Sequence, residues 1–276
     1  MSNEPAAGPS DRDFVQSIER GFAVLLAFDA DLPTPTLAEL ATATGYSRPA
    51  VRRILLTLQR LGYVASTGSR WTLTPRVLTI GQHFAATHGV VEVAQPHLLH
   101  LAEATQESAS LAQLDDLQVV YVARVQVRRV MRISIDVGSR VPIHATSMGR
   151  VLLAWAGADL VERVIASGLP QLTRTTVTDP VGFRNVLHDV RRLGFAVVDS
   201  ELEDGLLSAA VPVHDAQGDV LAALAYSTSV GRKSPDDIVA EIIPLMQEAA
   251  TGITRDLTSL RNAGPTISPQ ARDGFF

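Results

Sequence analysis

Apolar residues at helical spacing mark a short amphipathic helix over residues 48–58. The apolar positions that fall on one side of it are Val51, Ile54, Leu55 and Leu58. The positions on the other side are Pro49, Arg52, Arg53 and Leu56, with Arg48 at the edge of the apolar stripe. Ser47 is a favourable N-cap, because its hydroxyl can accept a backbone N–H of the first turn. The pattern predicts a helix that buries one side and presents arginines on the other.

The segments on either side of this helix complete a winged helix-turn-helix pattern. Residues 36–39, Thr-Leu-Ala-Glu, have the spacing of a capping box that begins a helix. Gly45 can take the positive φ of the tight turn that follows, and two helices joined in this way are typical of a helix-turn-helix. Beyond the second helix, residues 61–65 and 70–73 have the pattern of two strands around a turn, which is the expected wing.

Charge distinguishes this segment from the rest of the chain. Between Thr36 and Arg76 there are six arginines and one glutamate, a net charge of +5, whereas the whole chain carries −5. A basic module in an acidic protein is typical of phosphate-backbone binding. The alternative is an ordinary solvated face, since charged runs are usually just exposed. We expect binding to double-stranded operator DNA, and the residues expected to contact it are Thr36, Tyr46, Ser47, Arg48, Pro49, Arg52, Arg53 and Arg70.

The remaining pattern predicts a second domain of α+β class, a sheet backed by helices. A helix over residues 13–29 precedes the helix-turn-helix, with one apolar face made of Phe14, Ile18, Phe22, Leu25 and Leu26. In the second domain the expected helices are 91–105 (interrupted by Pro96), 146–155, 159–167, 181–193 and 235–260. The expected strands are 108–114, 118–125, 132–135, 195–199, 207–213 and 220–227, with a loop at 137–142.

The domain organisation follows from these elements and from the length of 276 residues, which suits two domains. We expect disordered ends, a winged helix-turn-helix domain, a linker helix that Pro75 begins, and the α+β domain. The expected boundaries are 1–12 for the disordered N-terminus, 13–74 for the DNA-binding domain, 75–90 for the linker helix, 91–260 for the second domain and 261–276 for the disordered tail.

Composition excludes several kinds of site. The chain has no cysteine, which excludes disulfides, thiolate metal sites and cysteine nucleophiles. No apolar run approaches the roughly 18 residues of a membrane span, and residues 1–10 lack the apolar core of a signal peptide, so we expect a cytoplasmic protein. No catalytic, phosphate-loop or dinucleotide motif occurs, so we expect no enzyme and no cofactor. His97 and His100 share a helix face, but without a matching third ligand we expect no metal site.

Four motifs occur in order along the chain. They are Phe-Val-Gln-Ser-Ile-Glu-Arg-Gly at 14–21, Thr-Leu-Ala-Glu-Leu-Ala at 36–41 with Gly-Tyr-Ser-Arg at 45–48, Leu-Thr-Pro-Arg-Val-Leu at 73–78, and His-Ala-Thr-Ser-Met-Gly-Arg at 144–150. Together they resemble the isocitrate lyase regulator (IclR) family of bacterial transcription factors, from residue 14 to about residue 260. The segments 93–98, 121–125 and 145–150 further resemble the branch that regulates protocatechuate, 4-hydroxybenzoate and β-ketoadipate catabolism.

The resemblance implies a GAF-like second domain, dimers that often pair into tetramers, and a small carboxylate effector. The residues it places at the effector are Ser147, Met148, Gly149, Asp199, Ser208 and Ser227. The carboxylate is expected on the backbone N–H groups of residues 147–149, where the helix dipole favours an anion. Ring hydroxyls would then reach Asp199 or Ser208. The family commonly has glycine or alanine where this chain has Ser147 and Met148.

Plainer interpretations stay open for this candidate site. Thr146 or Ser147 can simply cap the helix, while Gly149 allows close packing. Asp199 and Glu201 can accept a ligand hydroxyl, pair with Arg124 or Arg140, or face solvent, and a solvated loop is the expectation for residues 201–204. His144 can be a ligand contact or a loop residue.

These observations predict a ligand-responsive transcriptional regulator of an aromatic-acid catabolic operon. The alternatives are a regulator that responds to another small carboxylate, such as a 2-oxo acid, and a DNA-binding module that needs no ligand. RNA polymerase would be a further partner if the protein is an activator.

Overall fold

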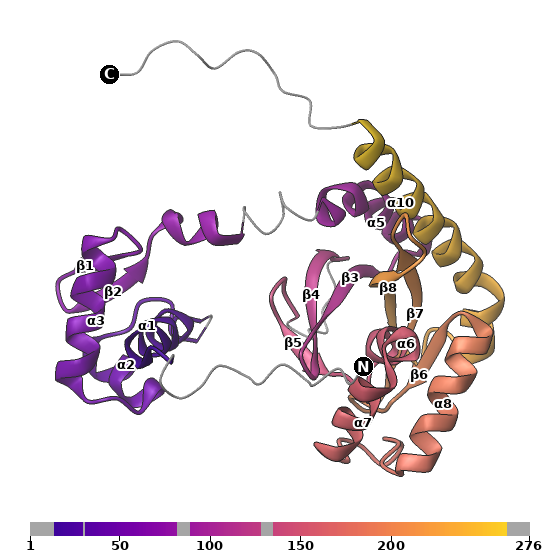
Figure 1. Ribbon diagram of the computed structural model, residues 1–276, viewed down its shortest axis with the longest axis horizontal. Coiled ribbons are helices and arrows are strands. Elements are labelled where there is room, and N and C mark those ends of the chain that lie inside the picture. Colours follow the sequence, from indigo (N-terminus) through magenta and orange to yellow (C-terminus); the bar gives the residue numbers. More distant parts are fainter. Residues whose placement is uncertain (1–13, 30, 82–88, 128–134, 264–276) are drawn as a thin grey trace, which may run out of the picture. The chain divides into compact units, whose positions relative to one another are not determined.

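The computed structural model describes residues 14–29, 31–81, 89–127 and 135–263. For residues 261–263 it describes the backbone only. The chain divides into two compact units between Thr87 and His88 (Figure 1). Several predictions fall partly or wholly outside the described residues: the strand at 132–135 except Ile135, residues 82–88 of the linker helix, the disorder of 1–12, and residues 264–276 of the disordered tail expected at 261–276. Each unit is described below by itself.

The first unit is a winged helix-turn-helix. Its elements are α1 (Gln16–Leu26), α2 (Leu37–Thr44), α3 (Arg48–Arg60), the antiparallel strands β1 (Val64–Thr67) and β2 (Arg70–Leu73), and a 3₁₀ turn η1 (Pro75–Val77). Its core is made of Val24, Leu40, Val51, Leu55, Leu58 and Val64. The predicted stripe of α3 is therefore confirmed. The capping box is also present, since Thr36 Oγ1 accepts the Glu39 N–H and Glu39 Oε2 accepts the Thr36 N–H.

Three local predictions for this unit are wrong. Ser47 occupies the N-cap position of α3, but its hydroxyl accepts no capping hydrogen bond. The first wing strand begins at Val64 instead of residue 61, because α3 ends in a Schellman motif: Gly62 takes φ +82°, and the Tyr63 N–H bonds back to the Leu58 carbonyl. Helix α1 is shorter than predicted and turns a different face to the core.

The apolar face predicted for α1 is largely exposed. Phe14, Ile18, Phe22 and Leu26 are each at least half exposed. Ile18, Phe22 and Leu26, at a spacing of four residues, lie on one side of α1, and Phe14 precedes the helix. Val24 is instead the fully buried residue of α1. The row is therefore apolar surface that this unit leaves in contact with water.

The second unit is a six-stranded antiparallel sheet between two layers of helices. The strand order is β5-β4-β3-β8-β7-β6. The strands are β3 (Ser108–Asp115), β4 (Gln118–Val125), β5 (Arg140–Pro142), β6 (Ala196–Asp199), β7 (Leu206–His214) and β8 (Val220–Ser229). The helices are α5 (Val90–Thr105), α6 (Ser147–Trp155), α7 (Ala158–Ala166), α8 (Pro180–Leu193), α9 (Pro235–Asp237), a π-helical turn η2 (Ile238–Ile242) and α10 (Ile243–Ala263).

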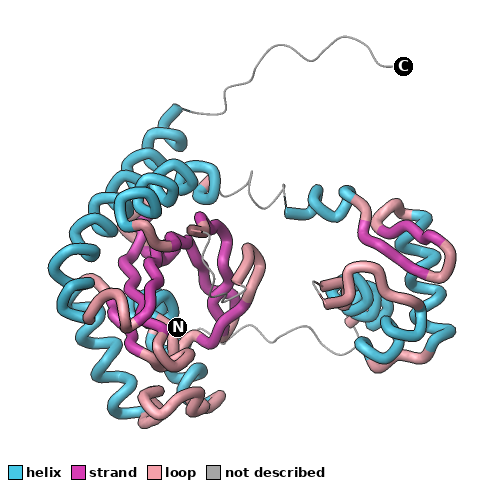
Figure 2. Tube along the Cα trace, turned by 180° about the vertical axis from the view of Figure 1, so that it is seen from behind, coloured by secondary structure: helices cyan, strands magenta, loops and turns pink. Residues whose placement is uncertain are grey.

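The two helical layers form two separate cores with the sheet. Helices α5 and α10 lie side by side along one face, and Leu98 of α5 and Met246 of α10 are buried there. Helices α6, α7 and α8 cover the other face, where Phe183 of α8 is fully buried. Figure 2 shows the strands of this unit flanked by helices. The α+β class is confirmed.

Three details of the second unit differ from the prediction. The expected loop at 137–142 contains the short edge strand β5. Helix α5 runs through Pro96 without interruption, because Pro96 is on the exposed side, where the carbonyl that loses its partner can meet water. The final helix starts at Pro235 as expected, but it contains a π-helical turn at Ile238–Ile242 and continues to Ala263, past the expected end at residue 260.

Strand β4 contains a β-bulge that decides which side chains face α6. Ala123 pairs with Leu111 and Tyr121 pairs with Ala112, so Val122 is an extra residue without a partner position on β3. Side chains alternate along a regular strand, and Tyr121 and Arg124, three positions apart, would point to opposite faces. The extra residue shifts the alternation by one. Both side chains consequently line the same pocket.

Candidate DNA-binding surface and effector pocket

The exposed side of α3 carries three arginines with free guanidinium groups. Arg48, Arg52 and Arg53 are exposed, and within the described part of the chain their side chains make no hydrogen bond or ion pair. Ser47 and Pro49 beside them are also exposed. Unpaired arginines on a helix whose other side is buried are available for phosphate and base edges.

The other residues predicted to contact DNA also make contacts within the first unit. Arg70 Nη1 donates to the Thr34 carbonyl at 2.7 Å and lies 3.9 Å from Glu39 Oε2, and a backbone bridge joins Thr36 to Arg70. These bonds attach the wing to the start of α2. Tyr46 is half buried, with the Arg20 guanidinium 5.6 Å from its ring centre.

A pocket of about 40 Å³ opens between the sheet and the start of α6. Its lining residues are Tyr121, Arg124, Ile135, Ala145, Thr146, Ser147, Met148, Val198, Leu202, Leu206, Ser208 and Ser227. Two rows cross the sheet beneath it. Val198, Ser208, Ser227 and Ser108 form one row, and Ala196, Ala210, Ala225, Ser110 and Arg124 form the next. The small residues of the second row leave room above the strands.

Among the described residues that line this pocket, Arg124 is the positively charged one. Its Nη1 donates to Ser110 Oγ at 3.3 Å, while its buried Nε has no hydrogen-bond partner. Burial lowers the pKa of Arg124. The Tyr121 ring centre lies 5.8 Å from the guanidinium, and burial raises the pKa of Tyr121 to about 12, although the nearby Arg124 opposes that shift. A desolvated guanidinium with a spare N–H is suited to a carboxylate.

The sequence did not identify Arg124 as a ligand contact. The residue pattern suggests Arg124 only as a possible partner of Asp199 or Glu201. A regular strand would place Arg124 and Tyr121 on opposite faces. The bulge at Val122 leaves no mark in the sequence pattern that could have shown this.

Four of the six predicted effector residues line the pocket. They are Ser147, Met148, Ser208 and Ser227. The Ser147 hydroxyl donates to Ser208 Oγ at 3.1 Å and so joins α6 to β7. Asp199 is exposed, outside the lining, and accepts a hydrogen bond from the Ser200 hydroxyl at 2.7 Å.

Gly149, the remaining predicted residue, lies against the protein backbone. A Cβ at this position would stand 1.9 Å from the Ile143 carbonyl oxygen. The Gly149 N–H donates to Thr146 Oγ1 at 3.2 Å, so Thr146 caps α6 as one interpretation had it. This N–H is therefore occupied, and Ser147 and Met148 hold the first two positions of the helix, where N–H groups lie outside the helical ladder.

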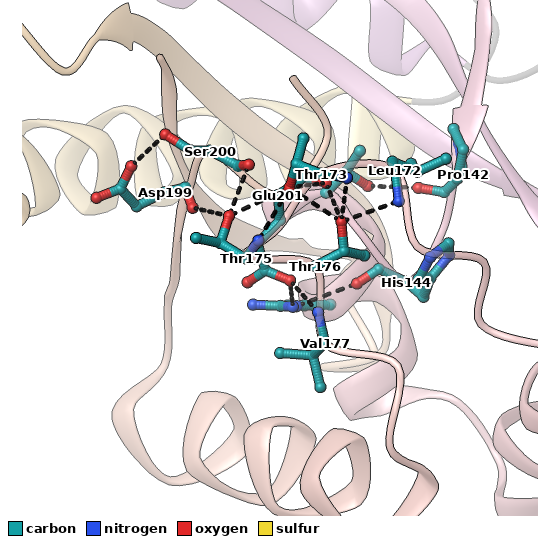
Figure 3. Close-up of polar contacts among 12 residues, drawn as sticks. Pro142, His144, Leu172, Thr173, Thr175, Thr176, Val177, Asp199, Ser200 and Glu201 are labelled. Carbon is teal, nitrogen blue, oxygen red and sulfur yellow. Dashed lines mark hydrogen bonds and ion pairs between the residues drawn. The ribbon is translucent and has the colours of Figure 1, made fainter. Parts of the chain in front are cut away.

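The expectation of a solvated loop is wrong for Glu201. This side chain is buried and forms an ion pair with Arg150 of α6, also buried, at 2.5 Å (Figure 3). His144 is buried beside the pair, and its Nε2 bonds to the Pro170 carbonyl at 3.0 Å. Burial lowers the pKa of His144, and Arg150 lowers it further.

Other polar side chains of the second unit have structural partners. His97 Nε2 lies 2.9 Å from Asp256 Oδ2 and joins α5 to α10, and Arg140 pairs with Asp115. Among the described residues, no group of three or more histidine, aspartate or glutamate side chains could hold a metal ion. No described helix has the length and apolar character needed to cross a membrane.

Comparison with known protein families matches both units. Residues 17–68 match the IclR helix-turn-helix domain, and residues 82–255 match the C-terminal domain of bacterial IclR transcriptional regulators. The Pca regulon regulatory protein of Pseudomonas putida is 38% identical over 90% of this chain and 86% of its own length. The p-hydroxybenzoate hydroxylase transcriptional activator of Acinetobacter baylyi is 34% identical over 86% of this chain and 90% of its own length.

Solved structures agree with this match. A transcriptional regulator of Rhodococcus sp. RHA1 has a TM-score of 0.80 at 42% identity, over 90% of this chain and all of that one. An IclR homolog of Microbacterium hydrocarbonoxydans, complexed with 4-hydroxybenzoate, has a TM-score of 0.80 at 25% identity, over 88% of this chain and 99% of that one. The matched families and relatives are regulators rather than enzymes. A winged helix-turn-helix and a pocketed α+β unit, each matched in sequence, show that this chain belongs to the IclR family of bacterial transcriptional regulators.

Proposed function

We propose that this protein regulates an aromatic-acid catabolic operon by binding operator DNA through its first unit and an aromatic carboxylate in the pocket of its second unit. The observation that carries the proposal is Arg124, a partly desolvated guanidinium with an unpaired Nε among hydroxyl and apolar groups. The relatives named for the Pca regulon and for p-hydroxybenzoate hydroxylase, and the homolog that binds 4-hydroxybenzoate, support the same class of ligand.

The two ends of the pocket differ in chemistry, and this favours a ligand with an acid at one end and a hydroxyl at the other. Arg124 stands on β4, and Ser208 stands on β7, three strands away in the sheet. At about 4.8 Å between strands, their backbones are separated by roughly 14 Å. The arginine side chain covers part of this span, which leaves a length suited to one benzoate ring. The carboxylate meets Arg124 at one end, and a ring hydroxyl meets Ser208 or Ser227 at the other end, beside the start of α6.

The proposal includes a homodimer, with a dimer of dimers as its larger form. The exposed apolar row of α1 supports self-association, because burying it removes Phe14, Ile18, Phe22 and Leu26 from water. RNA polymerase is the further partner if the protein is an activator. Since its DNA target lies in the bacterial cytoplasm, the protein acts there.

Calorimetric titration with 4-hydroxybenzoate, protocatechuate and β-ketoadipate tests the ligand. Arg124→Met removes the charged contact, and loss of a hydrogen bond to a charged group costs about 1.5–3 kcal/mol, or about 10- to 100-fold in affinity. Ser208→Trp should abolish binding by filling the pocket. Arg140→Met is the matched control, because Arg140 is half exposed, paired with Asp115 and outside the pocket; its affinity should equal that of the wild type.

Each result has a defined meaning. If none of the three acids binds the wild type below millimolar concentration, the aromatic-acid assignment is refuted; binding of a 2-oxo acid in their place would identify the alternative effector class. Equal loss of affinity in the Arg124 and Arg140 variants would show that the carboxylate does not use Arg124.

A further inference from the structure

We infer that the buried Arg150–Glu201 ion pair is a positioning element that sets the shape of the effector pocket without touching the effector. This inference rests on the proposed function of that pocket. Arg150 and Glu201 are only 4% and 7% exposed, and their charged groups approach to 2.5 Å. Neither residue lines the pocket, so any influence on the effector must pass through the segments that the pair holds.

The stability of the fold does not by itself explain why two charged side chains are buried here. Moving two charges out of water costs several kcal/mol per ion, and apolar pairs of similar volume are often equally stabilising. What an apolar pair cannot supply is a set of directed hydrogen bonds. Arg150 and Glu201 make directed bonds of this kind to their surroundings.

Directed bonds from the pair reach three loops (Figure 3). Arg150 Nε donates to the His144 carbonyl at 3.2 Å. Glu201 Oε2 accepts the Val177 N–H at 2.9 Å, and the Glu201 carbonyl accepts the Thr176 hydroxyl at 2.7 Å. These bonds hold three loops together around α6, namely residues 142–146, 169–177 and 199–206.

The loop that carries Glu201 is also held in a costly backbone conformation. Ser200 has φ +56°, a region that non-glycine residues rarely adopt. Its N–H donates to the Leu206 carbonyl at 2.7 Å, and its own carbonyl accepts the Thr175 hydroxyl at 2.7 Å. Such a conformation persists only where the surroundings determine it, which is what the contacts around the ion pair do.

Two walls of the pocket belong to the fastened loops. Ala145 and Thr146 follow His144 directly, and Leu202 follows Glu201, with Leu206 at the end of the same loop. Without the pair, both walls gain freedom and the binding-competent arrangement becomes a fraction of the population. If that fraction falls to about one tenth, the apparent affinity for the effector falls about ten-fold.

Three variants and a control test the inference. Glu201→Gln keeps the shape and an acceptor oxygen. Glu201→Leu removes the bonds of the carboxylate, keeps the backbone bond to Thr176, and leaves Arg150 as a buried charge, which can prevent folding. The double variant Arg150→Met/Glu201→Leu removes both charges and keeps the volume. Glu162→Leu is the control, because it breaks the exposed ion pair between Glu162 and Arg184, whose Oε2 and Nη2 lie 2.7 Å apart.

Two measurements are made on the full chain: amide hydrogen exchange of residues 144–148 and 200–206 without ligand, and calorimetry with 4-hydroxybenzoate. The double variant should melt cooperatively, exchange these amides about ten-fold faster and bind about ten-fold more weakly. Glu201→Gln should recover most of the affinity, and Glu162→Leu should match the wild type in both measurements.

The exchange measurement separates this inference from the proposed function. If the amides of residues 200–206 exchange at the wild-type rate in the double variant, the inference is wrong, whether or not the acid binds. Faster exchange with unchanged affinity also overturns it, since the loops would then not set the pocket. If the double variant exchanges these amides faster but the wild type binds no aromatic acid, the role of the ion pair in holding the loops is supported and the proposed ligand is refuted.

Discussion

Replacing Gly149 by alanine should destabilise the second unit, although alanine normally favours a helix over glycine. The exchange gains about 1 kcal/mol from helix propensity. The new Cβ, however, would stand 1.9 Å from the Ile143 carbonyl oxygen and 2.7 Å from the Ile143 Cα. Both atoms belong to the backbone, so no side-chain rotation relieves the contact, and the carbonyl must retreat by about 1.5 Å to reach an ordinary distance of 3.4 Å.

Overpacking a core costs about 1–3 kcal/mol, and a backbone clash of this size belongs at the upper end of that range. The net loss is then about 2 kcal/mol, which lowers the Tm of a unit of roughly 190 residues by about 4–8 °C. Trp155 of α6 reports the second unit, because the other tryptophan, Trp71, is in the wing and can be changed to phenylalanine. Thermal melting followed by Trp155 fluorescence measures the effect.

Gly21→Ala is the matched control. Gly21 is inside α1, and nothing lies within 4 Å of a Cβ built there. This exchange should stabilise the first unit by about 0.4–1 kcal/mol and leave the Trp155 transition unchanged. A Gly149→Ala protein that melts at or above the wild-type temperature would refute the close-packing argument and return Gly149 to the list of candidate ligand contacts.

Three further predictions concern DNA, association and pH. Arg52→Ala or Arg53→Ala should weaken operator binding by about 1–3 kcal/mol if the arginine reads a base, and by less with a shallower salt dependence if it meets phosphate; unchanged affinity and salt slope in both would disprove the contact. Ile18→Glu/Phe22→Glu should lower the mass measured by sedimentation and remove protection of a second half-site about one helical turn away in footprinting; an undiminished oligomer would exclude the α1 face. The pKa of His144 is lowered by burial, so as pH falls below about 6.5 the unfolded state binds the proton first and stability decreases. Urea unfolding at pH 7.5 and 5.5 should show a smaller decrease for His144→Gln, and an equal decrease would remove His144 from the acid response.

Sequence periodicity predicted the elements that depend on neighbours in the chain, and it missed what depends on distant ones. The stripe of α3 and the capping box at Thr36 are local patterns, and both are present. The burial of Glu201 depends on Arg150, 51 positions earlier, and no local pattern contains that pairing. The exposed face of α1 was misjudged for a related reason, since periodicity identifies an apolar face without saying whether its partner belongs to the same chain.

The bulge at Val122 has a consequence for how such a pocket can change in evolution. Straightening the bulge without changing the number of residues would restore regular pairing in β4, and the side chains on one side of Val122 would turn over together. Arg124 and Tyr121 could then no longer share a face, so the pocket would lose either its cation or its phenol. Deleting Val122 itself would have the opposite outcome, because Tyr121 and Arg124 would then stand two positions apart and keep a common face. The positions of β-bulges in relatives therefore deserve the same scrutiny as substitutions when effector chemistry is compared.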